Sequence, residues 1–385
     1  MVRLGRLAVA AAAVAALAVA AAPGSAAHAW PAQPPTGPAR AAIATPVAVF
    51  GSDDRVPVPA KYKDLQDKIG LLFNPRARSV CTAFCVARDI VATAGHCLHR
   101  TAGERVPRLA DFWFARNYDV VRDFARIAGY GNGTATQRVM TGATGLRVRP
   151  PIDATSDWAL LRLAKPVCAK GVLPIRVLAM DDILREAAAG RVFQVSYHRD
   201  FTPWKLAYSR PCTVSKRFEG ADWATIEQDF SEPGTLILHT CDTAGASSGS
   251  PLLRETPAGP EVIGINVGTY VQSKVEMQGG QVTRRLKSDM VANTGVASAA
   301  FADKLEIFRD AVILSSPAQM RELQAALKAR GLFAGRIDGT YGAELRRAIE
   351  AYEKAERLPA TGLATEALLK RLGGGPAAAK AKAKS

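Results

Sequence analysis

The stretch DTAGASSGSP, residues 242–251, carries the most specific signal in this sequence. It consists mainly of small residues, and the apolar pair Leu252-Leu253 follows it directly. Small residues allow a tight turn in which backbone N–H groups point at one spot, which is the arrangement of an oxyanion hole. The segment therefore predicts a loop that presents a serine hydroxyl beside backbone hydrogen-bond donors.

Acyl transfer by a serine also needs an imidazole that takes the hydroxyl proton and a carboxylate that orients the imidazole. The segment CTAFCVARDIVATAGHC, residues 81–97, predicts two strands joined by a turn, with His96 directly beyond the second strand. A scaffold of strands can aim a histidine at that place into a cleft. Asp157 lies at the start of the apolar strand predicted up to Leu163. These residues are the candidates for the base and for the orienting acid.

In the order histidine, aspartate, serine, these motifs resemble those of chymotrypsin-like serine peptidases. The serine loop resembles that of the bacterial glutamyl-endopeptidase branch, which usually ends in Ser-Gly-Ser-Pro. The resemblance spans residues 47–313 and implies a mainly β fold of two six-stranded antiparallel β-barrels. It implies Ser248 as nucleophile, His96 as base and then acid, and Asp157 as the group that orients His96. The backbone N–H groups of Ala246 and Ser248 are the implied oxyanion donors.

Four residues are expected to contact the substrate: Asp242, Thr243, Asn266 and Gly268. The strand 262–268 resembles the strand that pairs with the substrate backbone beside the primary specificity pocket. Asp242 lies six residues before Ser248, the offset at which trypsin-like relatives hold the acid that binds Arg or Lys. We therefore hypothesise cleavage after basic residues. A structural carboxylate beside Cys241 is the alternative interpretation of Asp242.

The sequence also departs from the family pattern. Ala246 stands where glycine is usual, and a β-carbon costs roughly 1–2 kcal/mol if φ is positive there. Ser247 replaces the acid that pairs with a new N-terminal amine in trypsin-like relatives, so that zymogen switch is not expected. Asn266 replaces the histidine of glutamyl enzymes, so a strict preference for Glu is not implied. Residues 51–55 resemble the start of the mature enzymes of that branch.

Six cysteines suit three disulfides in an oxidising compartment, although spacing alone does not fix their connectivity. The expected pairs are Cys81–Cys97 from the resemblance, Cys212–Cys241 because both lie near strands expected beside the serine loop, and Cys85–Cys168 by elimination. The sequence contains no Cys/His cluster with zinc-ligand spacing. We expect neither a metal ion nor another cofactor.

The first 29 residues are interpreted as an export signal. Arg3 and Arg6 precede an apolar run from residue 7 to 22, and Ala-His-Ala at 27–29 offers a cleavage site. This layout predicts a signal peptide at 1–29. An uncleaved membrane anchor is the alternative, but the run is shorter than the ~20 residues that span a bilayer. Residues 30–46, rich in Pro and Ala, are expected to be a pro-segment or disordered lead-in. We expect a secreted or periplasmic protein without stable membrane insertion after signal cleavage.

The hydrophobic period changes after Pro317. Apolar residues recur every three to four positions, which predicts helices, and Ile337-Asp338-Gly339 begins a tight turn between the first two. Residues 317–372 resemble the peptidoglycan-binding-like domain that is often appended to secreted bacterial enzymes. The resemblance implies a small three-helix domain that binds the cell wall; a packing module or a protein-docking surface is the alternative. Residues 373–385 are expected to form a disordered basic tail.

The composition is that of an ordinary globular protein. The chain has 385 residues, 48% of them hydrophobic and 22% charged, which excludes a wholly disordered chain and a multispanning membrane protein. The formal charge of +15 is spread along the chain, without a basic stripe interleaved with aromatics, so no nucleic-acid partner is expected.

The predicted function is a secreted serine endopeptidase with a protein or peptide substrate and peptidoglycan as a partner of its C-terminal domain. A catalytically weak or inactive peptidase-like protein that acts as a peptidoglycan-binding protein is the alternative. An enzyme that cuts wall stem peptides is a third interpretation with the same chemistry.

Overall fold

The structure is a computed structural model. It describes residues 48–98, 109–118, 124–127, 138–143, 146–147, 149–201, 204–218, 222–272, 275–278, 281–285, 289–314 and 316–373. The predicted signal peptide (1–29), lead-in (30–46) and tail (373–385, apart from its first residue) lie outside the described residues.

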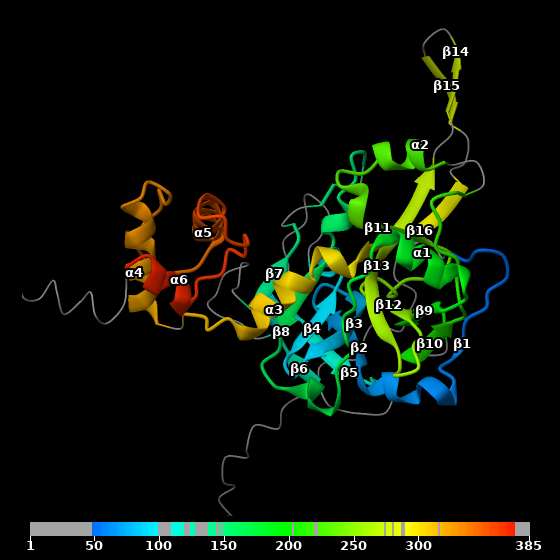
Figure 1. Ribbon diagram of the computed structural model, residues 1–385, viewed down its shortest axis with the longest axis horizontal. Coiled ribbons are helices and arrows are strands. Elements are labelled where there is room, and N and C mark those ends of the chain that lie inside the picture. Colours follow the sequence, from blue (N-terminus) through cyan, green and yellow to red (C-terminus); the bar gives the residue numbers. More distant parts are fainter. Residues whose placement is uncertain are drawn as a thin grey trace, which may run out of the picture. The chain divides into compact units, whose positions relative to one another are not determined.

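The first half of the chain forms a seven-stranded antiparallel sheet in the order β6-β5-β2-β3-β4-β8-β7 (Figure 1). Its strands are β2 (Ile69–Asn74), β3 (Ser79–Ala87), β4 (Ile90–Thr93), β5 (Trp113–Arg116), β6 (Phe124–Arg126), β7 (Val139–Thr141) and β8 (Ala159–Arg162). All residues of β2 and β4 are buried. A bridge between Ile127 and Leu163 joins the chain after β6 to the chain after β8, so the sheet curls back on itself.

The second sheet also has seven strands, in the order β1-β10-β9-β12-β13-β16-β11. They are β1 (Val56–Pro57), β9 (Val192–Tyr197), β10 (Leu206–Ser209), β11 (Leu236–His239), β12 (Pro251–Arg254), β13 (Glu261–Gln272) and β16 (Asp289–Ala297). A bridge between Val214 and His239 links the chain beyond β10 to β11. A separate hairpin consists of β14 (Val275–Gln278) and β15 (Gln281–Arg285).

The expected mainly β architecture with two antiparallel sheets and C-terminal helices is confirmed. Each described sheet has seven strands where the resemblance implied six. Short strands at the sheet edges account for the difference: β1 has two residues, and β6 and β7 have three each.

Helices in this part of the chain are short. The α-helices are α1 (Met180–Ala188), α2 (Trp223–Gln228) and α3 (Ala302–Asp310). The 3₁₀ turns are η1 (Ala60–Asp67), η2 (Gly95–Cys97), η3 (Leu109–Asp111), η4 (Ala154–Ser156), η5 (Val167–Lys170), η7 (Pro233–Thr235) and η8 (Ser298–Ala300). Most of the strands and α3 contribute to one hydrophobic core, which includes Phe84 of the first sheet and Phe193 of the second.

The C-terminal helices are α4 (Pro317–Lys328), α5 (Ala343–Ala355) and α6 (Glu366–Arg371). They enclose a core of their own, which includes Leu323, Leu327, Leu345 and Ile349, as the helical period predicts. Leu314 belongs to that core, and its N–H donates to the carbonyl of Ala364 at 2.9 Å. The extended residues just before α4 therefore form part of the helical unit.

All three predicted disulfides are confirmed: Cys81–Cys97, Cys85–Cys168 and Cys212–Cys241. The Cys81–Cys97 bridge ties β3 to η2, the turn that carries His96. No helix among the described residues is both long enough and apolar enough to cross a bilayer.

Candidate active site

Strand pairing places His96 and Asp157 side by side. Strand β4 pairs with β8 so that Thr93 lies opposite Ala159; His96 follows β4, and Asp157 precedes β8. Nδ1 of His96 lies 2.7 Å from Oδ2 of Asp157, and the backbone N–H of His96 donates to Oδ1 at 2.8 Å. A β-carbon at Gly95 would lie 3.2 Å from Oδ1, so glycine at that position leaves room for the carboxylate.

The environment of His96 leaves Nε2 of the neutral ring able to accept a proton. Burial disfavours the charged ring, but the charge and the hydrogen bond of Asp157 outweigh it and raise the pKa of His96 above its ordinary value. Because Asp157 accepts a hydrogen bond from Nδ1–H, the lone pair of the neutral ring lies on Nε2. The His96 side chain is 38% exposed, against 11% for Asp157, so a substrate can reach the ring.

Ser248 lies on the loop between β11 and β12, and Thr82 of β3 holds that loop. The backbone N–H of Thr82 donates to the carbonyl of Ser248 at 2.9 Å, and its hydroxyl donates to the carbonyl of Ala246 at 2.8 Å. Sγ of Cys97 lies 3.9 Å from the Ser248 carbonyl oxygen and 4.0 Å from Nε2 of His96. The structure thus brings the backbone of Ser248 and the His96 ring to the same disulfide sulfur.

Two residues of this loop adopt left-handed backbone conformations. Gly249 has φ +83°, and a β-carbon there would lie 2.1 Å from Oγ1 of Thr93 and 2.3 Å from the carbonyl oxygen of Thr82, so only glycine fits. Ala246 also has φ 83°, although it carries a β-carbon. This conformation is strained for an L-residue by roughly 1–2 kcal/mol.

Some backbone N–H groups of the loop are used within the described part of the protein, whereas those of Ala246 and Ser248 are not. Ser247 N–H donates to the carbonyl of Ala244 at 3.0 Å, and Gly249 N–H donates to that of Asn266 at 2.7 Å. The N–H groups of Ala246 and Ser248 have no acceptor among the residues that the structure describes. These are the two donors expected from the sequence for an oxyanion.

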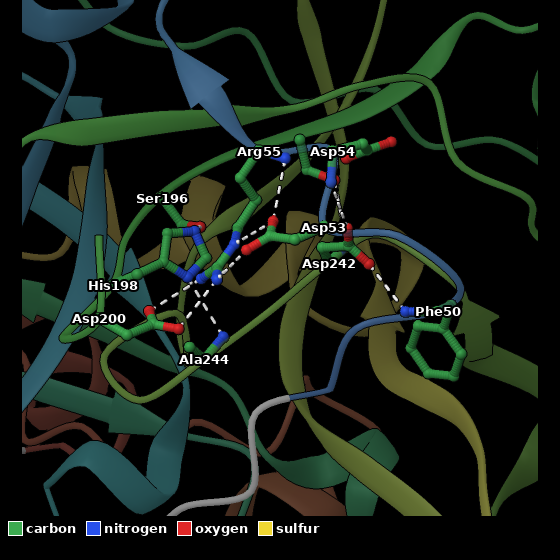
Figure 2. A network of polar contacts seen from close by, with 10 residues as sticks. Phe50, Asp53, Asp54, Arg55, Ser196, His198, Asp200, Asp242 and Ala244 are labelled. Carbon is green, nitrogen blue, oxygen red and sulfur yellow. Dashed lines mark hydrogen bonds and ion pairs between the residues drawn. The ribbon is translucent and has the colours of Figure 1, made fainter. Parts of the chain in front are cut away.

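The Asp242 carboxylate binds backbone N–H groups of segment 48–55. Its side chain is buried, Oδ1 accepts the N–H of Phe50 at 2.9 Å, and Oδ2 accepts that of Asp54 at 3.0 Å (Figure 2). Thr243, also buried, exchanges two backbone hydrogen bonds with Ala48, each 2.9 Å long. Segment 48–55 therefore uses both oxygens of the Asp242 carboxylate, which matches the structural interpretation of this residue.

A buried histidine fixes the start of the same loop. Burial, followed by the charge of Arg55, lowers the pKa of His198 to about 3, so the ring is neutral at physiological pH. Its Nδ1 accepts the N–H of Ala244 at 3.2 Å, and Nε2 therefore carries the proton and donates to Oγ of Ser196 at 2.8 Å (Figure 2). No sequence motif marked His198, because its role depends on contacts between distant segments.

Arg55 closes this network at its other end. Its side chain is 3% exposed and forms ion pairs with Asp53 at 2.7 Å and Asp200 at 2.9 Å. The hydrogen bond of Asp53 is the main cause that raises the pKa of Arg55. The guanidinium thus ties segment 48–55 to the chain beyond β9.

Asn266 faces the serine loop. Its Oδ1 accepts from Nε2 of His239 at 3.1 Å, and its Nδ2 donates to the carbonyl of Ser247 at 3.2 Å. Burial lowers the pKa of His239 to about 4, which keeps that ring neutral. Both the oxygen and the nitrogen of the Asn266 amide therefore form hydrogen bonds within the protein. Gly268, two residues further along β13, lines a cavity of about 320 Å³ that is also lined by His96 and Asp157.

Two groups in the described part of the chain have metal-like spacing: Cys81 with His96 and Cys97, and Cys212 with His239 and Cys241. In both groups the two cysteines are joined as a disulfide. A disulfide sulfur is not the thiolate that metal ions bind, so neither group is a metal site in this oxidised form.

Two segments of the chain match known protein families. Residues 81–265 match the family model described as trypsin-like peptidase domain, and residues 316–372 match the one described as putative peptidoglycan binding domain. A solved structure titled "Structure of Glu endopeptidase in complex with MPD" shares 16% identity and a TM-score of 0.42, over 68% of this chain and 98% of that chain. No curated protein matches the chain. Residues 81–265 are therefore similar to trypsin-like peptidase domains, and residues 316–372 are similar to peptidoglycan-binding domains.

The strain at Ala246 can be measured. Ala246→Gly should raise the free energy of unfolding by about 0.5–1 kcal/mol, because removing the β-carbon relieves more strain than the added chain entropy costs. Urea denaturation measures the change. Ala244→Gly is the matched control: Ala244 is also 6% exposed, lies in the same loop and has no positive φ. It should lose stability, and an equal loss in both variants would contradict strain at Ala246.

Proposed function

We propose that this protein is an exported serine endopeptidase in which Ser248, His96 and Asp157 form the catalytic triad. The observation that carries the proposal is the contact chain from Asp157 through His96 to the serine loop. Asp157 binds Nδ1 of His96 at 2.7 Å, and Nε2 on the other side of the ring shares the Cys97 sulfur with the backbone of Ser248. The match of residues 81–265 to the trypsin-like peptidase family supports the same chemistry.

In the proposed mechanism, Asp157 holds the tautomer of His96 that leaves Nε2 free to accept a proton. Nε2 of His96 takes the hydroxyl proton of Ser248 while Oγ of Ser248 forms a bond to the carbonyl carbon of the scissile peptide. The N–H groups of Ala246 and Ser248 donate to the oxyanion that develops. His96 then returns the proton to the leaving amine as the C–N bond breaks, and an acyl-enzyme forms. Water activated by His96 hydrolyses that ester and restores Ser248.

Export and wall targeting form the second part of the proposal. Three disulfides support a location outside the cytoplasm, because such bonds persist in oxidising compartments. The family match of residues 316–372 supports peptidoglycan as the partner of the helical unit. We propose residues 1–29 as the signal, 47–313 as the peptidase unit and 317–372 as the wall-binding unit. The chemistry proposed for Ser248 requires no cofactor.

One observation favours a second candidate function. Ala246 carries a β-carbon at φ 83°, in the place of a proposed oxyanion donor. Loss of one oxyanion-hole donor lowers kcat by about 10²–10³. A catalytically weak or inactive peptidase body, with the helical unit as the working part, is therefore the alternative.

The first prediction for the triad concerns Ser248. Ser248→Ala should lower kcat on casein by something on the order of 10⁶ and abolish labelling by a fluorophosphonate, because both reactions need the serine oxygen. Ser247→Ala, one residue away, should keep the label. A folded wild-type protein that neither hydrolyses casein nor takes the label would establish the inactive alternative.

The second prediction concerns the pH dependence of kcat/KM. Because the pKa of His96 is raised, the ring stays protonated to a higher pH, and kcat/KM should rise with pH through a value above the ordinary 6.5. Asp157→Asn removes the charge that raises this pKa. The acid limb should then move to lower pH while kcat falls roughly 10⁴-fold. Asp153→Asn is the control, because the native Asp153 carboxylate binds Arg147 and not His96, and it should leave the acid limb of the pH profile in place. An acid limb that does not move in Asp157→Asn would refute the assignment of Asp157 as the partner of His96.

The third prediction concerns binding to cell-wall peptidoglycan. The full chain carrying Ser248→Ala should sediment with insoluble peptidoglycan. A chain that ends at residue 311 should stay in the supernatant, since it lacks Leu314 and all three helices of the C-terminal core. Equal retention of both chains, at a level above that of an unrelated basic protein, would assign wall binding to the peptidase body.

A further inference from the structure

The cavity beside His96 has the size of a side-chain binding site. Its volume of about 320 Å³ lies at the lower end of the ~300–1,000 Å³ that small ligands occupy. Gly268 forms part of its wall, on the strand expected to pair with the substrate backbone. A peptide bound for attack by Ser248 therefore passes this cavity.

The walls of the cavity are largely apolar. Ile152 and Phe230 contribute from two neighbouring segments, which pair through a bridge, and Val267 and Tyr270 contribute from β13. The rings of Phe230 and Tyr270 pack with centroids 5.4 Å apart. The Tyr270 hydroxyl donates to Oδ2 of Asp229 at 2.5 Å, which fixes the ring. These side chains form a preorganised apolar surface.

The charges at the cavity are already paired within the protein. Nη2 and Nε of Arg147 bind the two oxygens of Asp153 at 2.8 and 3.0 Å, and this hydrogen bonding keeps the pKa of Asp153 far below its ordinary value. The Asp157 carboxylate is occupied by His96. A charged side chain that entered would lose hydration and find no unpaired charge of opposite sign among the described lining residues.

We propose that this cavity binds a large apolar side chain of the substrate, so that the enzyme selects peptides with an aromatic or branched aliphatic residue near the scissile bond. The proposal rests on the proposed function and names its substrate class. It replaces the hypothesis of basic specificity, because the Asp242 carboxylate is committed to Phe50 and Asp54. It also differs from a preference for Glu.

Two measurements test the proposal separately from the catalytic assignment. Mass spectrometry of the cuts in a peptide library gives the preference of the active enzyme. Saturation-transfer NMR gives the affinity of Ser248→Ala for capped tetrapeptides of alanine with one Phe, Leu, Glu or Lys at each position. Phe or Leu at one position should lower Kd at least tenfold relative to Glu and Lys, and cuts should cluster near such residues.

The outcomes are distinguishable. Binding selective for Phe or Leu without any hydrolysis would leave the cavity assignment standing and overturn the proposed function. Hydrolysis with a preference for Glu, Lys or Arg at every enriched position would overturn the cavity assignment and keep the function. Equal binding of all the peptides would also overturn the assignment.

A pair of variants ties the preference to the cavity. Ile152 and Ile175 are both partly buried against the same core, and each forms an isolated parallel bridge, but only Ile152 lines the cavity. Ile152→Ala should lower kcat/KM for Phe and Leu peptides about tenfold relative to alanine peptides, and it should weaken their binding to Ser248→Ala equally. Ile175→Ala should leave this ratio unchanged. A similar change in both variants would contradict the assignment.

Discussion

The contact between Thr82 and the serine loop is the constraint on which the candidate site depends. Thr82 belongs to the first sheet, which also supplies His96 and Asp157, whereas the loop that carries Ser248 comes from the second sheet. One residue holds two points of that loop, because its N–H binds the carbonyl of Ser248 and its hydroxyl binds that of Ala246. The hydroxyl of Thr93 binds the carbonyl of Thr82 at 2.8 Å, which extends this network to the strand before His96. Geometry within the site is therefore set between strands, where backbone positions are rigid.

The loop stays in a strained conformation because its surroundings hold it at several points. A left-handed alanine persists only where neighbouring contacts over-determine the backbone. Here His198 holds Ala244, Asn266 holds Ser247, and segment 48–55 pairs with Thr243. His198 and His239, which binds Asn266, are both neutral because burial lowers their pKa. Each therefore acts as a hydrogen-bonding group with a fixed tautomer. In trypsin-like relatives, an acid at the position of Ser247 forms an ion pair with a free N-terminal amine. In this chain, the carboxylate of Asp242 instead accepts hydrogen bonds from the backbone N–H groups of Phe50 and Asp54.

Sequence reasoning was most successful where function is concentrated in short motifs. The mainly β fold, the C-terminal helices and the three disulfides were predicted, and the three triad candidates belong to segments that the fold brings together. It did not identify the hydrogen-bond partners of Asp242 and Asn266, which lie at Phe50, Asp54 and His239. An offset from Ser248 locates Asp242 along the chain but does not show which way the carboxylate faces. His198, Arg55 and Thr82 gave no signal, since each acts through one or two hydrogen bonds to a distant segment.

By itself, the sequence determined which elements form and which chemistry is available. The helical period after Pro317 and the small residues around Ser248 act locally, so they can be recognised along the chain. Only the tertiary structure decided which charges are compensated: Arg147 by Asp153, and Asp242 by two backbone amides. That decision requires distances between segments up to 192 residues apart. Electrostatic and packing energies depend on those distances, and spacing in sequence does not contain them.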